Sequence, residues 1–112
     1  MSQNQKLWGR VETVLITASA DRASSDFVHE GNWYGCCVDT IANGETGMLH
    51  VRGAFEITKN NADEVIASGD FIEYVDTNKV QKHDQGVKVG KAYEASGAGT
   101  AKVVVVLMPE LY

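Results

Sequence analysis

The chain has 112 residues, 44% of them hydrophobic and 22% charged, which is the length and composition of one globular domain rather than of a disordered chain. Its formal net charge is −5 and its basic residues do not cluster, which argues against nucleic-acid binding because such proteins neutralise phosphates with Lys and Arg. No apolar run approaches membrane-spanning length, so no membrane contact is expected.

The start of the chain predicts an arm rather than part of the fold. Residues 1–6 are polar and show no periodicity, so we expect them to be flexible. Leu7 and Trp8 interrupt this polar segment, and Trp8 docks either on the protein's own core or on a partner, because large aromatic side chains are enriched in both places. We therefore divide the chain into an N-terminal arm over residues 1–10 and a single domain over residues 11–112.

Short apolar or alternating runs between glycine-rich turns predict strands along the rest of the chain. The expected strands are residues 11–17, 27–28, 33–40, 44–58, 71–75, 87–94 and 101–108, with a short run at Val80. Strands that follow one another about every ten residues, with 11 glycines between and within them, are typical of a small barrel or sandwich. The sequence therefore predicts an all-β fold.

The segment Gly44–Thr58 is the central strand of this scheme. Its apolar side chains recur at every second residue, as in a half-buried strand, and they are Leu49, Val51, Phe55 and Ile57. Gly53 falls on the same face, where a glycine indicates a bulge, a bend or a close approach by another backbone. We therefore expect one long strand with a kink.

Residues 61–67 predict the one short helix of the fold. Asn61 can accept a hydrogen bond as the N-cap, and Glu64 follows three residues later, as in a capping box. A helix of one or two turns is not stable alone, so it would have to pack on the sheet.

The last expected strand, residues 101–108, is apolar at consecutive positions instead of alternating. Such a strand is buried on both faces, either by the protein's own cover or by a neighbouring subunit. Val103, Val105 and Leu107 are therefore candidates for the core or for a subunit interface.

The sequence contains no recognisable catalytic, metal or cofactor site. Adjacent Cys36 and Cys37 point to opposite faces of a strand, which predicts small, buried, reduced thiols and a reducing, cytosolic setting. The three histidines, His29, His50 and His83, lack the spacing of metal ligands and are expected to be solvated, the first and last in turns. The acidic residues are expected to cap turns, and no nucleophile motif is present, so we expect no enzyme.

Five glycine-punctuated pieces, in this order and spacing, resemble the tailed-phage capsid cement, or head decoration, proteins, which are sometimes mislabelled as phage recombinases. The pieces are Ala42–Gly47, Gly53–Ile57, Ala67–Tyr74, Val89–Ala92 and Ala98–Val105, and the resemblance covers about residues 10–108.

The resemblance implies a barrel-like fold described as a β-tulip, assembled as homotrimers at three-fold positions on the capsid exterior. There the trimers would bind the major capsid protein and stabilise the head against the pressure of packaged DNA. The N-terminal arm, with Leu7, Trp8 and Arg10, would contribute to the grip. The protein would be made in the host cytoplasm and reside in the virion.

Two other functions stay open at the level of sequence. A ligand- or glycan-binding barrel on the virion surface would stack exposed Trp33, Tyr34 or Tyr93 on sugar, whereas the same side chains would otherwise belong to the core. A small hydrolase or recombinase is disfavoured by the absent motifs and by the acidic net charge.

Overall fold

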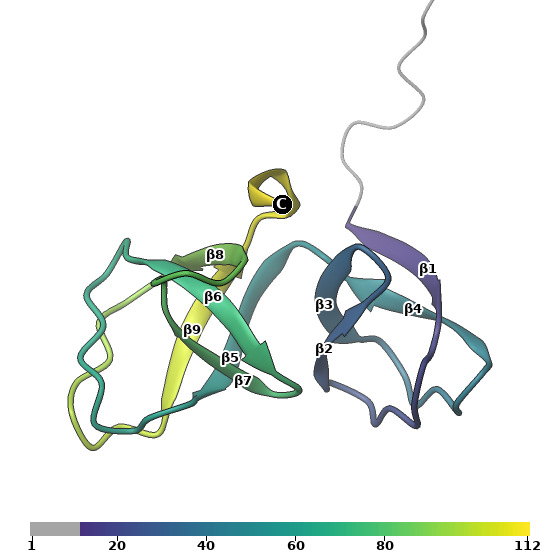
Figure 1. The fold of residues 1–112 in the computed structure, drawn as a ribbon, viewed down its shortest axis with the longest axis horizontal. Coiled ribbons are helices and arrows are strands. Elements are labelled where there is room, and N and C mark those ends of the chain that lie inside the picture. Colours follow the sequence, from purple (N-terminus) through teal and green to yellow (C-terminus); the bar gives the residue numbers. More distant parts are fainter. Residues whose placement is uncertain (1–11) are drawn as a thin grey trace, which may run out of the picture.

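The prediction of an all-β fold is confirmed by a computed structural model, which describes residues 12–112 (Figure 1). Within these residues the regular structure consists of nine strands and the short 3₁₀ helix η1 (Pro109–Leu111). The strands divide into a four-stranded sheet, here called the open sheet, and a closed five-stranded barrel. The predicted arm, including Leu7, Trp8 and Arg10, lies outside the described residues.

The open sheet is built from the first four strands of the chain. In spatial order they are β1 (Thr13–Thr17), β4 (Thr46–His50), β3 (Trp33–Cys37) and β2 (Phe27–Glu30). All neighbours are antiparallel. The loops between these strands cover one face of the sheet and enclose a small core that includes Val28, Cys37, Ile41 and Leu49.

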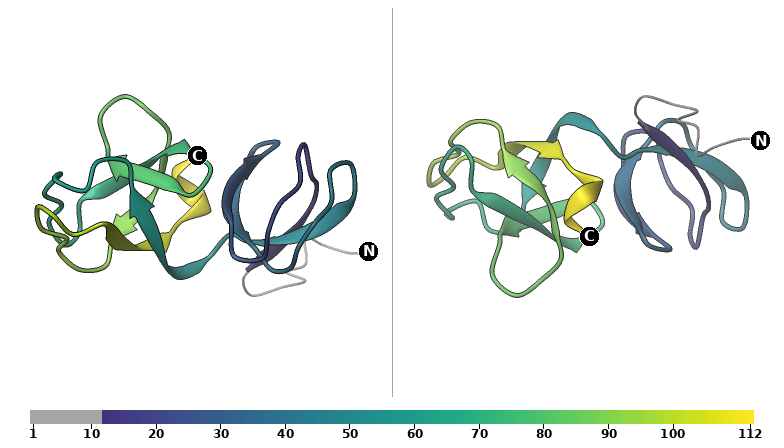
Figure 2. Two further views of the ribbon diagram at one scale, coloured as in Figure 1. Left: turned by 90° about the horizontal axis from the view of Figure 1, so that it is seen from below. Right: turned by 90° about the horizontal axis from the view of Figure 1, so that it is seen from above.

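The barrel is built from the remaining strands. In order around it they are β5 (Gly53–Lys59), β7 (Lys79–Lys82), β6 (Phe71–Asp76), β8 (Lys88–Ala92) and β9 (Lys102–Leu107). β5 and β7 are parallel and the other neighbours are antiparallel. Two views at right angles to Figure 1 show the barrel and the open sheet side by side (Figure 2).

The prediction of one long strand over Gly44–Thr58 is wrong, because the chain leaves the open sheet after β4 and enters the barrel as β5. The two residues between them, Val51 and Arg52, form the crossing. Gly53 follows with a φ of 114°, a backbone conformation that glycine adopts far more readily than residues with a side chain. The predicted alternation still describes the buried face, since Leu49 before the crossing, Val51 within it and Ile57 after it are all buried.

The predicted helix over residues 61–67 is also wrong. Asn61 does accept a hydrogen bond from the backbone N–H of Asp63, at 3.0 Å, but the chain makes only a turn there. Ile66 then pairs with Ser96 in an isolated antiparallel bridge, which fixes an extended conformation. The buried Lys59 ammonium donates to the carbonyls of Glu64, at 2.6 Å, and Gly97, at 3.0 Å, and so ties the turn to the opposite loop.

The last strand faces the barrel interior at alternate residues. Val103, Val105 and Leu107 are buried in the barrel core, whereas Val104 and Val106 are half-buried on the outside. The same core includes Phe27, Tyr34 and Cys36 from the open sheet. The open sheet therefore packs against the barrel through β2 and β3, on the face opposite its own small core.

Candidate functional site

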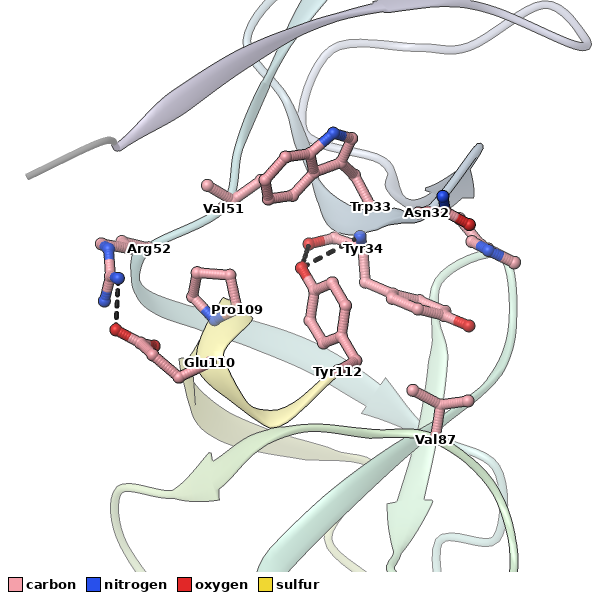
Figure 3. Close-up of a pocket in the computed structure, with 10 residues that line it drawn as sticks. Asn32, Trp33, Tyr34, Val51, Arg52, Val87, Pro109, Glu110 and Tyr112 are labelled. Carbon is pink, nitrogen blue, oxygen red and sulfur yellow. Dashed lines mark hydrogen bonds and ion pairs between the residues drawn. The ribbon is translucent and has the colours of Figure 1, made fainter.

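A groove of about 800 Å³ lies between the open sheet and the barrel (Figure 3). Its walls come from the β2–β3 hairpin, the crossing between β4 and β5, the loop before β8 and the segment after β9. The lining residues are His29, Asn32, Trp33, Tyr34, Val51, Arg52, Val87, Pro109, Glu110 and Tyr112. Because most of this lining is aromatic or aliphatic, the groove has the character of a binding surface.

Tyr112 joins the two halves of the molecule at the floor of this groove. Its hydroxyl accepts a hydrogen bond from the backbone N–H of Tyr34, at 3.1 Å, and donates one to the Tyr34 carbonyl, at 3.0 Å (Figure 3). These backbone groups lack a strand partner because β4 pairs with β3 only at Cys36 and Cys37. After His50 the chain leaves the open sheet for the barrel, so β4 does not extend alongside Tyr34. The Tyr112 hydroxyl therefore takes the place of a neighbouring strand.

Aromatic rings continue from Tyr112 into the core. The Tyr112 ring meets Tyr34 edge-on, with centroids 4.8 Å apart, and His29 stacks on Tyr34 at 4.1 Å. Tyr74, from β6 of the barrel, contacts Tyr34 at 5.2 Å and Phe27 at 5.7 Å. Offset and edge-to-face pairs of this kind add to the free energy of burial, so this cluster stabilises the junction.

Asn78 makes a second junction at the edge of β2. Its backbone N–H donates to the Phe27 carbonyl, at 2.8 Å, and its side-chain oxygen accepts from the Phe27 N–H, at 2.7 Å. Its side-chain nitrogen donates to Asp26, at 2.9 Å. Asn78 has a φ of 61°, which Asn tolerates better than most residues. The turn between β6 and β7 thus covers the β2 edge.

The charged groups near the junction are paired. Arg52 and Glu110 form an ion pair at one end of the groove (Figure 3). Arg22 donates to buried Glu30, at 2.8 Å, and to Thr77 in the barrel, at 3.2 Å. Burial acts to raise the pKa of Glu30, but the hydrogen bonds from Ser19 and Arg22 outweigh it, and the pKa lies below its usual value.

Across residues 12–112, no three His, Cys, Asp or Glu side chains are grouped closely enough to hold a metal ion. Cys36 and Cys37 are free and buried, and burial raises the pKa of the Cys36 thiol to about 12, so it is protonated at neutral pH. His29 lies in β2 and not in a turn as predicted. None of the helical structure in this part of the chain has the length and apolar character to cross a membrane.

The aromatic candidates for ligand stacking lie in different places. Trp33 is 36% exposed at the groove, and Tyr93 is 66% exposed on the barrel, away from the lining. Tyr34 is buried, and its ring stacks on His29 and meets Tyr112 edge-on. The groove therefore brings together Trp33 and Tyr34, but not Tyr93.

Sequence reasoning missed the residues that build the junction. The sequence patterns described above do not single out Tyr112, Glu110 or Asn78. Each acts on a residue far away in the chain, such as Tyr34 or Phe27, so no local pattern marks it.

The family model described as phage cement protein matches residues 9–107, which is most of the chain and includes both the open sheet and the barrel. No curated protein matches the chain.

Proposed function

The chain belongs to the phage cement protein family, and from this premise we propose that it binds the outside of the major capsid protein shell as a decoration protein. Family membership indicates a capsid-stabilising structural role in the virion. The match over residues 9–107 is the observation that carries the proposal. In this role the protein stabilises the head against internal DNA pressure, and homotrimers seated on the shell, with a β-tulip fold, are its proposed form.

The proposed mechanism is additive. Each copy buries a moderate area across the boundaries between capsid subunits, and many copies together hold the layer in place. The arm, with Leu7, Trp8 and Arg10, contributes to the grip, and an extended arm adds as a strand to a sheet edge of the capsid protein. The paired charges and buried polar groups of the junction support a rigid body suited to such a static role.

Co-sedimentation with empty capsids tests this function. Deleting residues 1–10 is expected to leave the fold intact, as judged by circular dichroism and thermal unfolding, and to weaken attachment to capsids. Leu7→Ala with Trp8→Ala should reproduce much of the loss, whereas Val65→Ala, at a side chain 64% exposed on the barrel, serves as a matched control. A truncated protein that decorates capsids with unchanged affinity would contradict the role of the arm.

The groove favours a second function, glycan binding on the virion surface. Its observation is Trp33, which is partly exposed and lines the same groove as Asn32 and Arg52, in a space large enough for a sugar ring. A screen against a glycan array, followed by titration with Trp33→Ala, tests it. Binding by the wild-type protein that Trp33→Ala abolishes is the expected result, and an array without a hit counts against this function.

A further inference from the structure

The outer edge of β1 is open among the described residues. β1 is the terminal strand of the open sheet, on the side away from the barrel (Figure 1), and its only strand neighbour within residues 12–112 is β4. The other terminal strand, β2, differs because Asn78 covers its edge at Phe27. Within residues 12–112 the open sheet therefore has one edge that another segment covers and one that none covers.

The hydrogen bonds at the two ends of β1 define which backbone groups point outward. Val51 donates to the carbonyl of Glu12, and Ala18 donates to the carbonyl of Glu45, both at 2.9 Å. In an antiparallel ladder, residues alternate between those that bond the neighbour and those that face away. The even-numbered residues of β1 therefore bond β4, and the odd-numbered residues present their N–H and C=O groups to the open edge.

The side chains of β1 lack the features that protect an edge strand. Natural edge strands carry Lys, Pro, a bulge or an inward charge to prevent pairing with another chain. β1 has the sequence Thr-Val-Leu-Ile-Thr, with no charge, no proline and an unbroken register against β4. Leu15 at its centre is 69% exposed, and its cross-strand partner Met48 is 41% exposed. This edge is uncharged, apolar and rich in β-branched residues.

We propose that β1 pairs antiparallel with β1 of a second copy of this chain, about a two-fold axis at Leu15. In this register Leu15 lies opposite Leu15 of the second copy, and Thr13 lies opposite Thr17. All three are odd-numbered, so their outward N–H and C=O groups bond reciprocally. The two open sheets then form one continuous eight-stranded sheet.

The self-complementary sequence of β1 favours a second copy over any other occupant. Read in either direction it has Thr at both ends, a β-branched apolar residue next, and Leu in the centre. The pairing places Met48, Leu15, Leu15 and Met48 in one row across the sheet face, which removes exposed apolar surface from water. It also places Glu12 opposite Ala18, so no like charges meet.

This contact is independent of the proposed function. The pairing is argued from residues of β1 and β4 alone, and a two-fold contact can join copies whether or not they also form trimers. Loss of capsid binding and loss of β1 pairing are therefore separate results.

Engineered cysteines test the register. Residues that face each other in such a hydrogen-bonded pair have Cα atoms about 5.5 Å apart, within the range of a disulfide. Thr13→Cys mixed with Thr17→Cys should therefore give a disulfide-linked dimer under mild oxidation. Either variant alone should not, because identical positions are four residues out of register, about 13 Å apart. Cys36 and Cys37 are buried and give little background. Equal cross-linking in the mixture and in the single variants would overturn the proposal.

Charge substitution at the axis provides a second, reversible readout. Leu15→Lys alone and Leu15→Glu alone should each lose the two-fold contact, because like charges then lie directly opposite, and mixing the two should restore it. Mass by light scattering over a concentration series reports the contact. Val65→Lys, at an equally exposed side chain on the barrel, should leave the mass unchanged. A Leu15→Lys protein with the wild-type mass, or a wild-type protein without this contact up to millimolar concentration, would refute the pairing.

Discussion

The hydroxyl of Tyr112 allows the junction between the open sheet and the barrel to be tested with a single atom. Tyr112→Phe keeps the ring, and hence its edge-on contact with Tyr34, but removes the group that both accepts from the Tyr34 N–H and donates to the Tyr34 carbonyl. Tyr34 is buried, so its two backbone groups have little access to water as a replacement partner.

The expected loss follows from the number of groups left unpaired. Tyr112→Phe leaves two buried backbone groups of Tyr34 without a partner, and each such group costs about 1–3 kcal/mol. Because the Tyr112 hydroxyl no longer has to be desolvated, part of this cost is offset, and the net decrease in the free energy of unfolding is expected to be about 1–3 kcal/mol. For a domain of this size, each kcal/mol lowers the melting temperature by roughly 4 °C or somewhat more.

Urea unfolding at pH 7, followed by intrinsic fluorescence and by circular dichroism, measures this loss. Tyr93→Phe is the matched control, because it removes the same atom from a side chain that is 66% exposed, and it should change stability by less than about 0.5 kcal/mol. If Tyr112→Phe unfolds like the control, the hydroxyl does not replace a strand and the argument for the junction fails.

Two further substitutions test the barrel. Burial acts to raise the pKa of Glu73, but hydrogen bonds from Asp84, Gln81 and Gly86 outweigh it and hold the pKa below its usual 4.5. The ionised Glu73 therefore stabilises the fold fully above pH 4.5, and this stabilisation is lost as the pH falls through the folded-state pKa. Glu73→Gln should therefore be less stable than wild type at pH 7, and the difference should shrink toward pH 3 in urea titrations, whereas a pH-independent difference would contradict this assignment. Val105→Asp should abolish folding, because it buries an unpaired charge in the barrel core. Val65→Asp, at an exposed side chain, should leave folding intact. A soluble Val105→Asp protein with native circular dichroism would show that β9 is not enclosed.

The faces of the strands could be predicted from the sequence, but their division into two sheets could not. Leu49, Val51 and Ile57 share one face of the predicted strand and all three are buried, yet Leu49 lies in the open sheet, Val51 in the crossing and Ile57 in the barrel. Period-two alternation reports which side of a strand meets a core, and it does not report which core. Gly53 was the correct local signal, and its φ of 114° gives the physical reason.

The error at residues 61–67 has a tertiary cause. The capping pattern of Asn61 and Glu64 predicted a helix, but the bridge from Ile66 to Ser96 and the hydrogen bonds from Lys59 fix an extended loop instead. The groove could not be predicted from the sequence either, because its walls are joined by residues far apart in the chain, such as Tyr34 and Tyr112.

The pairing of β5 with β9 has a consequence for the order in which the protein folds. These strands are the first and last of the barrel, and they pair over six residues each, from Gly53 with Leu107 to Thr58 with Lys102. Contacts between such distant residues require a large loop to close and are formed slowly. During synthesis β5 therefore waits for β9 to leave the ribosome, whereas the strands of the open sheet are complete by His50. We expect the N-terminal half to be the first to acquire structure on a nascent chain, with barrel closure as the late, rate-limiting event.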